Sequence, residues 1–114
     1  MFDSILTTTG TLPMRLARSR RVELRVPVHL RQDRREWYAV AAVVNRSGGL
    51  LRSPVACEPD SRIRVMNTET GETAPFRVVW CREYAPGRHE LGIALVHPCP
   101  FYWGATYESL LSDS

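Results

Sequence analysis

Apolar residues occupy every second position between residues 22 and 30, and this alternation constrains the fold more than any other feature of the sequence. The series is Val22, Leu24, Val26, Val28 and Leu30. A period of two is that of a β-strand with one face in the core and the other toward solvent. We therefore expect the folded part of the chain to begin with a half-buried strand.

Further strands follow at short intervals, separated by clusters of turn-forming residues. β-branched, aromatic and alternating apolar residues are concentrated in the segments 37–44, 50–52, 62–66, 73–82 and 90–96. Glycine, asparagine and proline break the pattern between them. Six short strands at this spacing favour an antiparallel sandwich or a closed barrel, and closure would also remove aggregation-prone edges.

The apolar spacing changes near the C-terminus. Trp103, Tyr107, Leu110 and Leu111 follow the i, i+4, i+7, i+8 spacing of one helix face, so we expect a short C-terminal α-helix that packs on the strands. Residues 1–19 keep no such period and are predicted to be a flexible arm. Residues 20–114 are then a single domain, as a chain of 114 residues allows.

Composition narrows the class of protein. With 44% hydrophobic and 24% charged residues, the chain resembles ordinary globular domains. Neither a secretory signal nor an apolar run of about 20 residues is present, so we expect a soluble cytoplasmic protein without membrane insertion. The three cysteines form no C-x-x-C pair, which argues against a disulfide framework and a metal site. No nucleophile, base and acid form a catalytic motif, so no enzyme is expected.

All fifteen basic residues are arginines, and two short segments place some of them beside a turn. The first segment is Arg20-Arg21-Val22-Glu23-Leu24-Arg25, at the entry to the first strand. The second is Asn45-Arg46-Ser47-Gly48-Gly49, at the break between the second and third strands. Arginine forks contact phosphates and guanine edges through paired hydrogen bonds.

These two segments resemble the PilZ domain, a bacterial receptor for cyclic di-GMP, which carries an R-x-x-x-R element and then a D/N-x-S-x-x-G turn. The segments 76–80, 90–95 and 100–104 are similar to its later strands and tail, so the resemblance covers about residues 19–104. The turn departs from the motif, because Gly49 follows Ser47 by two residues and not by three. Either the glycine is out of register or one residue has been lost.

The resemblance implies a six-stranded antiparallel PilZ-type β-barrel with a short C-terminal α-helix, acting in second-messenger signalling through a downstream protein partner. It implies cyclic di-GMP as the ligand and no other cofactor. By the same resemblance, the ligand-binding residues are Arg20, Arg21, Arg25, Asn45, Ser47, Gly48 and Gly49.

Other interpretations remain open. A degenerate PilZ-like domain could bind no nucleotide and act as a protein–protein adaptor, and a basic barrel could bind single-stranded nucleic acid, which is the less favoured alternative. The arginines could form a solvated stripe, and the glycines could form a tight turn with positive φ angles. We expect Trp37, Trp80 and Trp103 to be core residues rather than stacking platforms.

Overall fold

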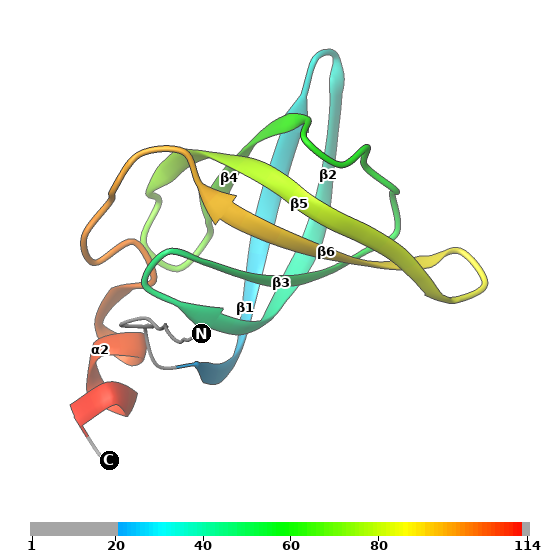
Figure 1. Cartoon of the computed structure of the whole chain (residues 1–114). Helices are drawn as coiled ribbons and strands as arrows, with labels where there is room; N and C mark the ends of the chain where they lie inside the picture. Colours follow the sequence, from blue (N-terminus) through cyan, green and yellow to red (C-terminus); the bar gives the residue numbers. More distant parts are fainter. Residues whose placement is uncertain (1–20, 113–114) are drawn as a thin grey trace, which may run out of the picture.

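The fold is a closed six-stranded antiparallel β-barrel with a short C-terminal helix (Figure 1), in a computed structural model that describes residues 21–112. The strand order around the barrel is β1-β2-β3-β6-β5-β4, and β4 pairs with β1 to close it. This confirms the predicted fold class. The elements are β1 (Val22–Gln32), β2 (Arg35–Asn45), β3 (Gly48–Ser53), β4 (Arg62–Asn67), β5 (Thr73–Ala85), β6 (Arg88–Leu95) and α2 (Gly104–Ser112).

The alternation predicted for β1 is interrupted by a β-bulge. β1 pairs Glu23 with Val43 and Val26 with Ala41, so two residues of β1 lie opposite one residue of β2. A bulge of this kind bends the strand and increases its twist. As a result Leu24 is only half-buried, whereas Val26 and the alternate positions beyond it face the core.

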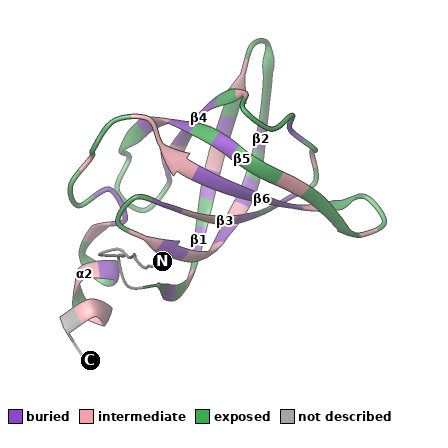
Figure 2. Ribbon diagram, viewed as in Figure 1, coloured by how far each residue is buried: buried purple, intermediate pink, exposed green. Residues whose placement is uncertain are grey.

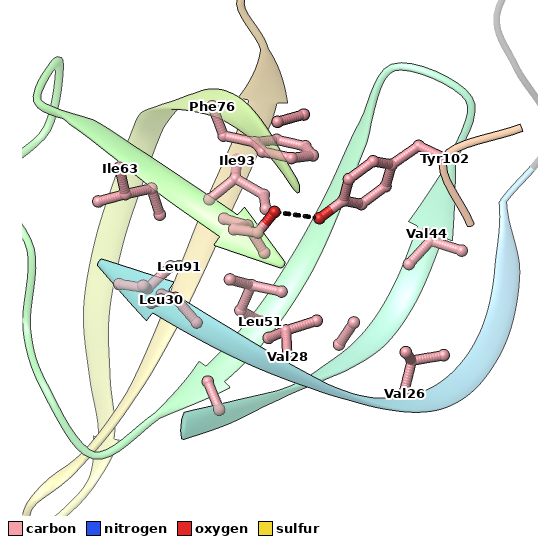
Figure 3. Packing of buried hydrophobic residues seen from close by; sticks show 14 of the residues in the cluster. Val26, Val28, Leu30, Val44, Leu51, Ile63, Phe76, Leu91, Ile93 and Tyr102 are labelled. Atoms are coloured by element: carbon pink, nitrogen blue, oxygen red, sulfur yellow. Dashed lines mark hydrogen bonds between the residues drawn. The ribbon is translucent and has the colours of Figure 1, made fainter. Parts of the chain in front are cut away.

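The C-terminal tail closes one end of the barrel and belongs to its core. Tyr102, Trp103 and Tyr107 are each 1% exposed. Figure 3 shows the Tyr102 ring directed into the barrel, where its hydroxyl donates a 2.5 Å hydrogen bond to the Val65 carbonyl. The buried Asn67 side-chain amide donates to the Tyr102 carbonyl at 3.0 Å. The expected packing of the C-terminal helix on the strands is therefore confirmed.

Burial alternates along most strands, with buried positions on the inner face and exposed positions on the outer face (Figure 2). Helix α2 is nine residues long. Within residues 21–112, no helix combines the length and apolar character needed to cross a bilayer. The predicted arm, residues 1–19, lies outside the described residues.

Candidate functional site

The β2–β3 turn is shorter than the sequence suggested. Only Arg46 and Ser47 form it, because Gly48 pairs with Asn45 and Gly49 pairs with Val44 as the first residues of β3. Neither glycine has a positive φ; among the described glycines that conformation occurs at other turns. The predicted turn over residues 45–49 was therefore wrong in extent, and the positive φ angles considered for its glycines are not found.

Gly48 and Gly49 are required by close backbone packing. A Cβ atom on Gly48 would lie 2.0 Å from the Ile93 carbonyl oxygen of β6, and one on Gly49 would lie 2.8 Å from the Val43 carbonyl oxygen. Real Cβ atoms do not approach backbone oxygens so closely, so only glycine fits. Gly48 thus allows β3 to pair closely with β6, and Gly49 allows it to pair closely with β2.

Asn45 caps the turn with its side chain. Its Oδ1 atom accepts hydrogen bonds from the Ser47 backbone N–H at 2.9 Å and from the Ser47 hydroxyl at 3.1 Å. An asparagine that bonds the backbone two residues ahead forms an Asx turn. The Asn45 carbonyl accepts from the Trp103 indole at 2.9 Å, and the Ser47 carbonyl accepts from the Leu95 N–H at 2.7 Å. The turn is thus tied to both β6 and the C-terminal tail.

Arg46, between the two predicted site residues, contacts the C-terminal helix. Its guanidinium donates to both carboxylate oxygens of Glu108 at 3.1 and 3.2 Å. It also lies 5.9 Å from the centre of the Tyr107 ring. Paired Arg–carboxylate bonds fix direction as well as distance, so α2 and the turn are held in one relative position.

A hollow of about 300 Å³, here called the turn hollow, lies beside this turn. It brings together five of the predicted site residues: Arg21, Asn45, Ser47, Gly48 and Gly49. Arg20 lies outside the described residues. The remaining lining comes from four strands, β2, β3, β5 and β6, and among the described residues it contains no carboxylate, so Arg21 makes the hollow cationic. These further lining residues are Val43, Val44, Leu50, Val79, Trp80, Gly92, Ile93 and Ala94.

Arg25 lies in a second hollow of about 830 Å³, here called the arginine groove. Val43 lines both hollows, so they adjoin over β2. The structure therefore places Arg21 and Arg25 over neighbouring surfaces of the barrel and not in one pocket. The groove is lined by Glu23, Leu24, Arg25, Val40, Ala42, Val43, Arg52, Tyr84 and Arg88.

Trp80 lines the turn hollow, although its position in the sequence predicts a core residue. A second bulge lies between Val78 and Trp80, which pair with Ile93 and Gly92, and it turns the indole outward. Trp80 is 41% exposed, and its ring lies so close to Gly92 that a Cβ there would be 2.3 Å from the indole nitrogen. The prediction was right for Trp37 and Trp103, which are buried.

A buried carboxylate organises the arginines on the outer side of β6. Glu90 accepts from Arg82 at 2.7 Å and lies 3.5 Å from the Nε atom of Arg52. The hydrogen bond from Arg82 is the main reason that the pKa of Glu90 lies below its ordinary value of 4.5, and it outweighs the burial that would raise the pKa. Arg52 is thereby fixed at the edge of the arginine groove.

The stability of the barrel should depend on pH through Glu90. Because its folded pKa is lowered, the Glu90 carboxylate stabilises the fold above its unfolded pKa of 4.5, and this stabilisation is lost as pH falls through the folded pKa. At pH 7 a Glu90→Gln variant should be less stable by about 1 kcal/mol, since its arginine partners are largely solvated. Urea unfolding between neutral and acidic pH measures this, and a difference from wild type that persists in acid would contradict it.

Comparison with known proteins shows a similarity of fold. No protein-family model matches the chain, and no curated protein matches it. Among solved structures, the Bacillus subtilis inhibitor of motility, MotI/DgrA, is similar with a TM-score of 0.63 at 10% sequence identity. The match covers 88% of this chain and 50% of that one, so the chain spans about half the length of MotI/DgrA.

Proposed function

We propose that this chain is a PilZ-type receptor that binds cyclic di-GMP at the turn hollow and passes the signal to a protein partner in a bacterial cytoplasm. The observation that carries the proposal is the convergence of Arg21, from the entry to β1, with the β2–β3 turn around one cationic hollow. Arg21 and the turn are more than 20 residues apart in the sequence. The six-stranded barrel and its likeness to MotI/DgrA support the fold on which the proposal depends.

The lining of the turn hollow suits a cyclic dinucleotide. Arg21 offers paired donors for a phosphate or for guanine O6 and N7. Trp80 offers an exposed aromatic face on which a base can stack. Gly48 and Gly49 line the same hollow, so the β3 backbone borders the ligand. Together these groups supply the cationic, aromatic and close-backbone contacts that an anionic purine ligand needs.

Arg25 extends the proposed site across Val43. A cyclic di-GMP, or an intercalated pair, that spans both hollows across Val43 would place a phosphate beside Arg25 in the arginine groove. Arg20, which lies outside the described residues, is proposed as a further cation for the same ligand. In this arrangement Asn45 shapes the turn through its bonds to Ser47, and it does not need the negative charge of the aspartate that is commoner in the family.

The adaptor alternative also has support from the structure. Gly48 and Gly49 are explained by strand packing, and Arg46 and Asn45 make internal contacts. A barrel in which these residues serve only to stabilise the fold would have the same geometry. Such a protein would bind a protein partner and no nucleotide. Both proposed functions, receptor and adaptor, are binding functions and not catalytic ones.

A calorimetric titration with cyclic di-GMP, with GTP as a control ligand, separates the two functions. We expect binding at micromolar concentrations or tighter in the wild type, and its loss in an Arg21→Ala/Arg25→Ala variant. The matched control is Arg62→Ala/Arg64→Ala, which removes two exposed arginines from β4, a strand that lines neither hollow. If the wild type shows no heat of binding, or if the two variants lose equal amounts of affinity, the adaptor function is favoured.

A further inference from the structure

Strand β2 is apolar on both faces, although the structure covers only one of them. The segment 37–44 contains no charged residue. Its inward residues are buried, whereas the outward Tyr38 is 67% exposed and the outward Val40, Ala42 and Val43 are half-buried. Strands with one solvated face usually alternate apolar with polar residues, and strands that are apolar on both faces are usually covered on both. The outer face of β2 thus has the composition of a contact surface.

Arginines surround this outer face. Val40, Ala42 and Val43 form part of the lining of the arginine groove, and Arg25, Arg52 and Arg88 reach it from three other strands. Glu23 is the one carboxylate in the described lining. The groove therefore combines an apolar floor with a net positive edge.

Two side chains at the groove are already positioned for contact. The guanidinium of Arg52 lies 5.9 Å from the centre of the Tyr84 ring and 3.5 Å from Glu90. The Tyr84 side chain remains 41% exposed. Because these contacts restrict Arg52 before any ligand arrives, less conformational entropy is lost when it binds an anion.

The net positive charge of the groove favours an acidic binding partner. Residues 1–20 carry three arginines and one aspartate, and a second copy of the chain has a net charge of +3, so both match the sign of the groove. Proteins that bind single-stranded nucleic acid combine a positively charged groove with aromatic residues on which successive bases stack. The groove has the charge, but its floor is aliphatic and Tyr84 is the one aromatic residue in the described lining. A segment with carboxylates and apolar side chains matches both the edge and the floor.

We propose that the arginine groove binds an acidic, amphipathic segment of a partner protein, with carboxylates on Arg52 and Arg88 and apolar side chains on Val40 and Ala42. This defines a class of partner for the proposed receptor. The peptide proposal does not require nucleotide binding, so it would still hold if the titration with cyclic di-GMP showed no binding.

The test uses the full chain and a fluorescent synthetic peptide in which glutamate alternates with leucine. We expect Arg88→Glu to weaken binding by about tenfold, because it replaces an attraction at the groove by a repulsion. Arg62→Glu makes the same change of charge on β4, outside the groove, and should leave the affinity within about twofold. Circular dichroism of each variant verifies that the barrel is folded, and Val40→Ser provides a second variant that alters the floor alone.

Three comparisons can overturn the inference. Equal losses for Arg88→Glu and Arg62→Glu would show diffuse charge attraction and no groove. A glutamate–serine peptide that binds as tightly as the glutamate–leucine peptide would show that the apolar floor plays no part. A single-stranded oligonucleotide that binds more tightly, and loses affinity on Arg88→Glu, would make the surface a nucleic-acid site. Weak binding by the wild type to every acidic peptide would also contradict the proposal.

Discussion

Replacing Gly48 by alanine is expected to destabilise the barrel by about 3 kcal/mol, at the upper end of what overpacking usually costs. The added Cβ would lie 2.0 Å from the Ile93 carbonyl oxygen and 3.0 Å from the Ala94 Cα atom. Both are backbone atoms of the paired strand, so no side-chain rotation can relieve the overlap. β3 must move away from β6, which weakens the pairing of the two strands at Gly48 and Ala94. The free energy of unfolding in urea measures the effect.

Two other glycines calibrate this prediction. Gly49→Ala places its Cβ 2.8 Å from the Val43 carbonyl oxygen and should cost less, about 1–2 kcal/mol. Gly87→Ala meets no atom within 4 Å but has φ +69°, so it measures backbone strain alone, about 1 kcal/mol. If Gly48→Ala were no less stable than Gly87→Ala, the close approach of β3 to β6 would be wrong. If Gly48→Ala does not fold, the difference in unfolding free energy between Gly49→Ala and Gly87→Ala still tests whether close backbone contact costs more than backbone strain.

The sequence was sufficient to predict the strands because burial follows their alternation. Val26, Val28 and Leu30 face the core at every second position. The residues with helical apolar spacing near the C-terminus form α2 and part of the aromatic group that covers one end of the barrel. The choice between sandwich and barrel could not be made from these local patterns, since it depends on the pairing of β4 with β1. Pairing between distant strands leaves no periodic signal within either one.

The site was less predictable because bulges shift register. One extra residue in β5 turned Trp80 from the core to the surface, and a bulge in β1 separates Arg21 from Arg25. In a single sequence, a bulge is visible only as a break in the alternation of apolar and polar residues. In β5 no such break is visible, because the extra residue, Val79, is itself apolar. Gly92, which lies opposite Trp80 and has no side chain, was the one local sign that a large ring covers this strand.

Replacing Trp80 by alanine is expected to weaken cyclic di-GMP binding by about 1–3 kcal/mol, or roughly 5- to 150-fold, which is the usual contribution of one base stacked on an aromatic ring. This prediction rests on the proposed function. Trp80 is 41% exposed, lines the turn hollow with Arg21 and packs on Gly92, so its ring is held with one face toward the ligand. Stability should fall much less than for a buried tryptophan, because much of the ring is already in water.

Calorimetry on three variants separates stacking from general apolar contact at Trp80. Trp80→Phe retains an aromatic face and should recover most of the affinity, whereas Trp80→Leu retains apolar area without a π-face and should not. Tyr38→Ala removes another exposed aromatic residue, 67% exposed on β2, which lines neither hollow and should leave the affinity unchanged. If the wild type binds and Trp80→Ala binds equally well, while Arg25→Ala does not, the nucleotide lies over the arginine groove. The nucleotide would then compete with the acidic peptide for the arginine groove, because both ligands would contact the surface around Arg25.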